Sequence, residues 1–240
     1  MRASDYREKA RQMLDGNWGK AILVTLVAGL LGGLLMQSSS GVNFNSDKET
    51  LMKLPEAVRT YFTVALSIAS VLAIVQFIIG GTVRLGYAKY LLNLHDGKEG
   101  SMKDLFSEFD RLGDAFIMSL LEAIYVALWS MLFVIPGVIA VYKYAMSSFI
   151  LLENPWMKPK EAITASKNLM HGHKFELFVL GLSFIGWNIL NLFTLGIGSL
   201  WLSPYMNASY AAFYRWISHT TPTWGHADAF DASEPVNPWQ

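Results

Sequence analysis

The chain contains no cysteine and few charged residues, and both shortages narrow what it can be. Among its 240 residues there are 0 Cys, which excludes disulfides, thiolate nucleophiles and cysteine-ligated zinc or iron–sulfur sites. Charged residues make up 16% of the sequence, against about 25% in a soluble domain, and hydrophobic residues make up 52%. Too few polar groups remain to coat a surface in water. Because 19 basic residues balance 19 acidic ones, net charge gives no argument for nucleic-acid binding.

The sequence contains several long runs of apolar residues with few or no charges. A helix rises about 1.5 Å per residue, so about 20 apolar residues cross a hydrocarbon core about 30 Å thick. The runs predict an all-α protein, a polytopic membrane bundle of about six transmembrane helices in three hairpins. The predicted spans are 21–36, 61–83, 116–134, 138–152, 175–193 and 198–217. They form one integral membrane domain over residues 1–217, and the polar, proline-containing segment 218–240 is predicted to be a disordered tail.

Two glycine-containing breaks divide the longest apolar runs. Ile135-Pro136-Gly137 interrupts the run 116–152, because proline removes a helix hydrogen bond and glycine relaxes the backbone. The sequence leaves open whether this break is a tight turn or a re-entrant kink. Thr194-Leu195-Gly196-Ile197-Gly198 divides the run 175–217 in the same way.

Basic residues predict the orientation of the spans. With six spans, 15 Lys and Arg residues fall on one side of the membrane and 3 on the other. Both termini are therefore predicted to be cytoplasmic in a multi-pass protein of the bacterial plasma membrane. A five-span alternative would mix the two groups. The first run follows a 20-residue charged leader and lacks a small-residue cleavage site, so we expect an uncleaved span rather than a signal peptide.

Three segments outside the spans have the periodicity of amphipathic helices. Each is predicted to pack on lipid headgroups or on the base of the bundle, with binding of a partner protein as the alternative. The first has Ser4 as its predicted cap, the second has capping-box spacing between Ser101 and Asp104, and the third starts near Pro159. Their predicted apolar faces are Tyr6, Ala10, Met13 and Leu14; Leu105, Phe106, Phe109 and Leu112; and Ala162, Ile163, Ser166, Leu169 and Met170.

Two charged residues lie inside predicted spans and are the candidate binding residues. A charge at the centre of a membrane helix costs about 2.5–3.5 kcal/mol on insertion scales. Glu122 in the third span and Lys143 in the fourth would lie at similar depths in a hairpin through Pro136. We predict that they form a structural ion pair. Snorkelling of Lys143 to the interface and a role of the two residues in binding a substrate or proton are the alternatives.

Other chemistry finds no support in the sequence. The imidazoles of His171 and His173 do not share a helical face and have no further ligand nearby, so an interfacial turn is expected there instead of a metal site. No serine has a His–Asp partner set, and there is no phosphate loop or dinucleotide fingerprint. We therefore predict no catalytic residues, no metal and no cofactor, and a protein that is not an enzyme.

Several short motifs resemble those of one family. They are Leu14-Asp15-Gly16-Asn17-Trp18, Ile135-Pro136-Gly137, Tyr142-x-Tyr144-x-Met146, Glu161-Ala162 with Ser166 and Leu169-Met170-x-Gly172-His173-Lys174, Leu182-Ser183-Phe184-Ile185-Gly186-Trp187, and Thr194-Leu195-Gly196-Ile197-Gly198 with Trp201 and Pro204-Tyr205. Over residues 5–217 this combination resembles the bacterial integral-membrane family catalogued as domain of unknown function nine hundred seventy-five, found mainly in Firmicutes. The resemblance implies a multi-span membrane protein with no assigned activity, and it supplies no catalytic residues.

The functional expectation follows from these absences and from the amphipathic helices. We expect a non-catalytic accessory or scaffold protein of the bacterial cell envelope, in contact with the lipid bilayer and with a possible membrane-protein partner. The alternative is a small-solute or peptide transporter or an immunity-type membrane protein, because the two interrupted apolar runs are typical of broken helices around a site. The sequence does not specify a substrate or an oligomeric state.

Overall fold

The fold is helical throughout the part of the chain that the computed structural model describes, residues 2–32, 55–194 and 196–220. No strand occurs in these ranges, which confirms the all-α prediction. In chain order the elements are α1 (Ala3–Leu14), α2 (Trp18–Gly32), α4 (Glu56–His95), α5 (Met102–Phe106), the 3-10 helix η2 (Phe109–Arg111), α6 (Leu112–Leu132), α7 (Val134–Tyr144), α8 (Ser147–Glu153), α9 (Pro159–Leu169), α10 (Lys174–Leu182), α11 (Ile185–Phe193) and α12 (Ser199–Thr220). Of the predicted tail, residues 218–220 continue α12, and 221–240 lie outside the described residues.

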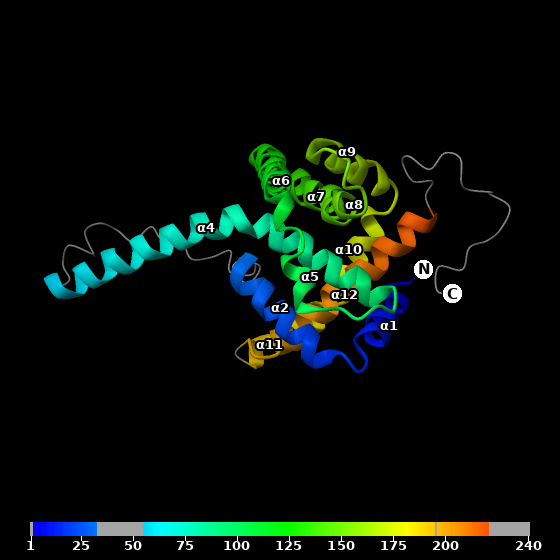
Figure 1. Ribbon diagram of the computed structural model, residues 1–240, viewed down its shortest axis with the longest axis horizontal. Coiled ribbons are helices and arrows are strands. Elements are labelled where there is room, and N and C mark those ends of the chain that lie inside the picture. The colour runs from blue at the N-terminus through cyan, green and yellow to red at the C-terminus, as the bar shows by residue number, and fades with distance from the viewer. Residues whose placement is uncertain (1, 33–54, 195, 221–240) are drawn as a thin grey trace.

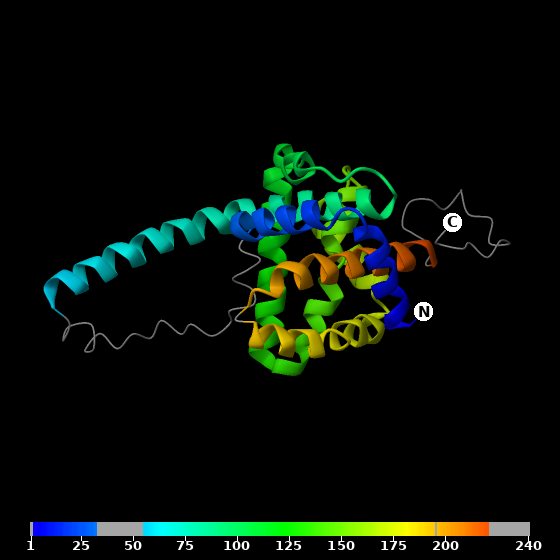
Figure 2. The same ribbon diagram turned by 90° about the horizontal axis from the view of Figure 1, so that it is seen from below.

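The core lies where the C-terminal half of α4 meets α1, α2 and α12 (Figures 1 and 2). Tyr6 of α1 packs edge-on against Phe213 and Trp216 of α12, with ring centroids 5.2 and 5.8 Å apart. The N-terminal half of α4 projects away from this bundle in both views. The single helix α4 therefore lies in the core with its C-terminal half and at the periphery with its N-terminal half.

Two of the three predicted amphipathic faces are buried in full. All four apolar residues of the first segment are buried on α1, and all five of the third are buried on or just after α9. The capping box of Ser101 and Asp104 is confirmed at the start of α5, but this helix has 5 residues, and Phe106 is exposed. The predicted cap Ser4 is wrong: α1 begins at Ala3, and the Asp5 carboxylate accepts a hydrogen bond from the N–H of Arg2 instead.

The first predicted break is a tight helical hairpin, displaced by a few residues. The chain turns at Phe133, which is extended (φ −160°, ψ 151°), and Pro136 lies in the first turn of α7. A proline is tolerated there because the N–H groups of a first helical turn have no partner in the helix. A Cβ atom on Gly137 would lie 2.2 Å from Ser130 Oγ, so glycine lets α6 and α7 pack side by side.

The second predicted break is confirmed, between α11 and α12. Gly196 has a φ of +86°, a conformation that favours glycine, and the N–H of Gly198 donates to Thr194 Oγ1 at 3.1 Å. The two apolar helices before and after this turn are therefore separate elements.

The fourth predicted span, 138–152, lies within Ile135–Glu153, a segment long and apolar enough to cross a membrane, but two residues, Ala145 and Met146, interrupt it between α7 and α8. The hydroxyl of Ser166, on α9, accepts a hydrogen bond from the N–H of Met146 (3.2 Å) and donates one to the carbonyl of Lys143 (2.9 Å). At this break the Ser166 side chain, about 20 residues further along the chain, therefore bonds to backbone groups of Lys143 and Met146. The hydropathy of the sequence alone does not predict this contact.

The fifth predicted span, 175–193, is divided in a similar way into α10 and α11. The hydroxyl of Ser183 donates to the carbonyl of Leu180 at 2.6 Å, directly after α10 ends. Local bonds of this kind compete with the helical hydrogen-bond ladder. The result is two 9-residue helices in place of one span.

Fewer than six segments among the described residues qualify as membrane-crossing helices. Within the described ranges, two helical segments are long and apolar enough to cross a membrane, Met102–Leu132 and Ile135–Glu153, and a third is possible if α1 and α2, bent by 102°, count as one. The predicted span 61–83 lies within α4, and the end of the predicted span 21–36 lies outside the described residues. The six-span, three-hairpin arrangement is not confirmed.

The break between α7 and α8 generates a first prediction. Replacing Ser166 with Ala leaves the N–H of Met146 and the carbonyl of Lys143 without their side-chain partner, and we expect a loss of about 1–3 kcal/mol in unfolding free energy. Denaturant unfolding of the protein in detergent micelles measures this loss. Ser107→Ala is the matched control, because the Ser107 hydroxyl bonds to a backbone carbonyl on the exposed surface. Equal stability of the two variants would contradict this role of Ser166.

Candidate functional site

A cavity of about 770 Å³ lies between α4, α6, α7, α8 and α12. Its volume is within the range of about 300–1,000 Å³ typical of small-molecule sites. Two charged residues line it, Arg84 from α4 and Glu122 from α6. Its other polar lining residues include Gln76, Ser119, Tyr142, Ser148, Asn207 and Tyr210. This combination of polar groups inside an apolar bundle makes the cavity the candidate functional site.

The close approach of α4 to α6 brings the two charges together. A Cβ atom on Gly81 would lie 2.5 Å from the carbonyl oxygen of Ala115, so only glycine allows this helix spacing. Ala115, Met118 and Glu122 follow one another along the buried face of α6, at the i, i+3, i+7 spacing of a helical stripe. Arg84 lies three residues after Gly81, and its Nη1 donates to Glu122 Oε2 at 2.7 Å.

The predicted partner of Glu122 is therefore wrong, because Arg84 occupies the place expected for Lys143. Lys143 Nζ instead lies over the ring of Trp129, 4.9 Å from its centroid, and Lys143 is not among the cavity-lining residues. Helical rise predicts the depth of a residue but not the direction in which its helix faces. Arg84 follows directly after the predicted second span, and α4 continues through it to His95. A basic residue one turn beyond a Gly-Gly pair is the signal that could have identified it.

Glu122 retains unused hydrogen-bonding capacity. Glu122 is 8% exposed, and its second carboxylate oxygen, Oε1, has no hydrogen-bond partner among the described residues. The buried hydroxyl of Ser148, also in the cavity wall, has none there either. A buried polar atom without a partner costs about 1–3 kcal/mol, so these groups favour a polar occupant. The Arg84 side chain is 35% exposed and has five N–H donors, of which the bond to Glu122 uses one.

Aromatic side chains form much of the remaining wall. Tyr87 is held by a hydrogen bond between its hydroxyl and Thr25 Oγ1 (2.8 Å), and Tyr142 packs edge-on against Phe178 at 5.9 Å. Tyr144 packs against Tyr125, with ring centroids 5.8 Å apart. The cavity therefore has aromatic walls in fixed orientations around one ion pair, an arrangement that can bind and orient a small molecule.

The histidine pair lies away from this cavity. Gly172 between the two residues has a φ of +91°, and His173 precedes α10, so the predicted turn is confirmed. His173 Nδ1 lies 3.1 Å from Glu176 Oε2, and its ring packs edge-on against Trp216. In the described parts of the chain there is no group of three or more His, Cys, Asp or Glu residues that could hold a metal ion.

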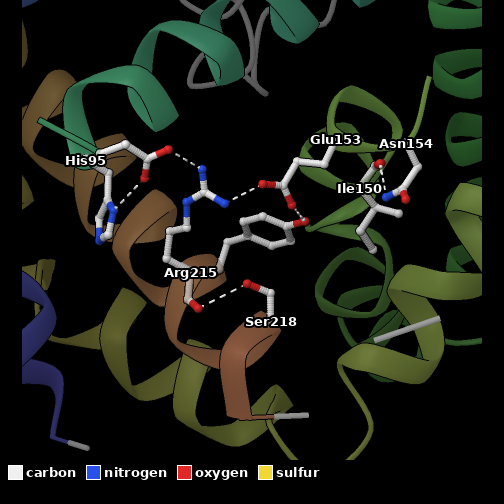
Figure 3. A network of polar contacts seen from close by, with 8 residues as sticks. His95, Ile150, Glu153, Asn154, Arg215 and Ser218 are labelled. Atoms are coloured by element: carbon white, nitrogen blue, oxygen red, sulfur yellow. Dashed lines mark hydrogen bonds and ion pairs between the residues drawn. The ribbon is translucent and has the colours of Figure 1, made fainter. Parts of the chain in front are cut away.

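A second polar network joins the ends of α4, α8 and α12 (Figure 3). The guanidinium of Arg215 bonds to Asp96 Oδ2 at 2.5 Å and also to Glu153, whose other oxygen accepts from the Tyr214 hydroxyl. Burial raises the pKa of Asp96, but the hydrogen bond with His95 and the charge of Arg215 outweigh it, so the pKa of Asp96 is lowered. Every charge in this network faces an opposite charge, so we assign it a structural role.

The cavity ion pair generates a second prediction. Glu122 is buried and Arg84 half-buried, so removing one member of the pair leaves an uncompensated, poorly solvated charge, whereas removing both does not. We therefore expect the unfolding free energies of Arg84→Gln and Glu122→Gln to be strongly non-additive in the double variant. Glu122→Gln and Lys143→Met, by contrast, should combine additively to within about 0.5 kcal/mol. Denaturant unfolding of the single and double variants in detergent gives both coupling energies, and a coupling found only for Lys143 would contradict the observed pairing.

Of three comparisons with known proteins, one gives a match. A search of curated proteins and a search of solved structures each found no match. The family model described as Protein of unknown function (DUF975) matches residues 1–142 and 131–221, two segments that together span nearly the whole chain. The resemblance found in the sequence motifs is thereby confirmed, and the chain belongs to the DUF975 family.

Proposed function

We propose that this protein is a multi-pass protein of the bacterial plasma membrane that binds a small polar solute in the cavity between α4, α6 and α12 and transports it. The single observation that carries the proposal is Glu122, a buried carboxylate that lines the cavity with one oxygen paired to Arg84 and the other without a partner in the described part of the chain. Ionisable residues inside membrane helices typically mark substrate or ion pathways.

The exposed apolar surface supports a membrane location. At the tip of the α6–α7 hairpin, Met131, Phe133 and Ile135 are exposed to 90%, 70% and 73%. Phe175, Trp187, Ile189 and Phe193 on α10 and α11 are also exposed. Soluble monomers rarely present contiguous apolar patches of this kind, whereas lipid is their natural surrounding.

Contacts at one end of the bundle support the proposed orientation, with both termini cytoplasmic. Arg215, near the end of α12, joins Asp96 after α4 to Glu153 at the end of α8. Tyr6 of α1 packs on α12 beside Arg215, at Phe213 and Trp216. These are segments that the distribution of basic residues assigns to one side of the membrane, and they lie together.

The break between α7 and α8 supports transport over simple binding. Tyr144, Ala145 and Met146, at that break, all line the cavity. Broken helices beside a buried site are typical of transporters, in which one helical unit moves against another.

A scaffold role is the second candidate, and the projecting half of α4 favours it. Val64, Val71 and Ile74 are exposed there, on a helix that extends away from the bundle (Figure 1). In this case the projecting helix would bind an apolar face of a partner membrane protein, and loss of the cavity charges would leave function intact.

The orientation is testable because the chain lacks cysteine, so each introduced cysteine is the sole labelling site. We expect Ile197→Cys, in the turn after α11, to react with a membrane-impermeant maleimide on intact cells. Lys98→Cys, after α4, should react only once the membrane is opened. The parent chain is the unlabelled control. Labelling of both positions from the same side would contradict the topology.

Solute binding is testable by thermal stabilisation of the detergent-purified protein across a library of small polar metabolites. A ligand at 100 times its Kd stabilises the native state by about 2.7 kcal/mol, and we expect at least one chemical class to do so. Glu122→Gln should lose this stabilisation. Glu108→Gln should keep it, because Glu108 is a similarly buried carboxylate, paired with Lys89, outside the cavity wall. If no class stabilises the parent chain, the solute-binding proposal is wrong and the scaffold candidate remains.

A further inference from the structure

We infer that the cavity recognises a zwitterion, an amino acid or a short peptide that carries both an ammonium and a carboxylate. The inference rests on the proposed solute-binding function and adds the chemical class of the ligand. Its starting point is the charge balance of the cavity wall, which contains one cation, Arg84, and one anion, Glu122. An unbalanced charge is costly to bury in such surroundings, so a ligand with no net charge is favoured over a single ion.

The contact between the two side chains leaves both of them able to bind a charged group. Arg84 and Glu122 meet through one nitrogen and one oxygen, Nη1 and Oε2, 2.7 Å apart. Glu122 Oε1, with no partner among the described residues, is an acceptor suited to an ammonium group. The remaining guanidinium N–H groups of Arg84 match the two oxygens of a carboxylate, which guanidinium binds bidentately.

A zwitterion uses both of these unused groups at once. Its ammonium would bind Glu122 and its carboxylate would bind Arg84, so the four charges alternate in sign around a closed ring. A neutral polar molecule such as a sugar would form only bonds assisted by one charge, whereas ion-to-ion hydrogen bonds are the stronger kind. The buried Ser148 hydroxyl provides a further donor or acceptor in the same wall.

The size and walls of the cavity define the rest of the ligand. A volume of about 770 Å³ exceeds what the charged groups need and leaves room for side chains. Phe77, Tyr142, Phe149 and Tyr210 line it. Phe149 is held in place by stacking on Tyr214, with centroids 4.9 Å apart. Fixed aromatic rings provide apolar contact area, so we expect a preference for amino acids or dipeptides with apolar side chains.

The experiment uses the full-length protein in detergent and begins with a thermal-shift panel of the standard amino acids and their dipeptides. The strongest binder is then compared, by titration calorimetry, with the amine that lacks its carboxylate and with the acid that lacks its amine. For phenylalanine these analogues are phenethylamine and hydrocinnamate. We expect each singly charged analogue to bind about tenfold or more weakly, because each loses one charged hydrogen-bonding group.

Charge variants assign each contact. Glu122→Gln should weaken binding of the zwitterion and of the amine but not of the acid, and Arg84→Gln should weaken binding of the zwitterion and of the acid but not of the amine. Glu108→Gln is the matched control and should bind as the parent chain does. Where a cavity variant does not fold, the analogue series on the parent chain decides the question by itself.

The two proposals fail in distinguishable ways. If the panel gives no binder, or if the singly charged analogues bind as tightly as the zwitterion, zwitterion recognition is overturned. Solute binding then still stands when another class in the metabolite library stabilises the protein and Glu122→Gln removes the effect. If neither the panel nor the library stabilises it, both proposals fall.

Discussion

Close packing around the C-terminal half of α4 is the constraint on which the rest of the structure depends. From Gly81 to Leu94 nearly every residue is buried or half-buried, so neighbours cover this segment on all sides. Two glycines allow them to approach. A Cβ atom would lie 2.5 Å from the Ala115 carbonyl at Gly81 and 2.2 Å from the Leu105 carbonyl at Gly86. In membranes, where apolar burial drives helix association weakly, small residues at such contacts are what close packing requires.

The buried polar groups of the bundle divide into two kinds once this packing is in place. Ser166 and Arg215 bond to groups of other helices, so Ser166 bridges the break between α7 and α8 and Arg215 joins the ends of α4, α8 and α12. Glu122 is different, because one of its oxygens is paired and the other is buried without a partner among the described residues. A group of the first kind stabilises the fold, while the second oxygen of Glu122 is the group that the proposed solute would bind.

The arrangement of the broken helices connects these two kinds of polar group. Ser166 of α9 bonds across the break between α7 and α8, and residues of that break form part of the cavity wall. The same contact that holds this break therefore also shapes one side of the cavity.

Local patterns determined much of this protein, and tertiary contacts decided the rest. The buried faces of α1 and α9, the start of α9 at Pro159 and the turn at Gly196 follow from residues within a few positions of one another, so the sequence by itself predicted them. The partner of Glu122 and the hydrogen bond at Met146 did not follow, because each depends on a side chain about 20 or more residues away. Hydrophobic periodicity reports which residues avoid water and how deep they lie, but the direction in which each helix faces its neighbours is set only when the helices pack.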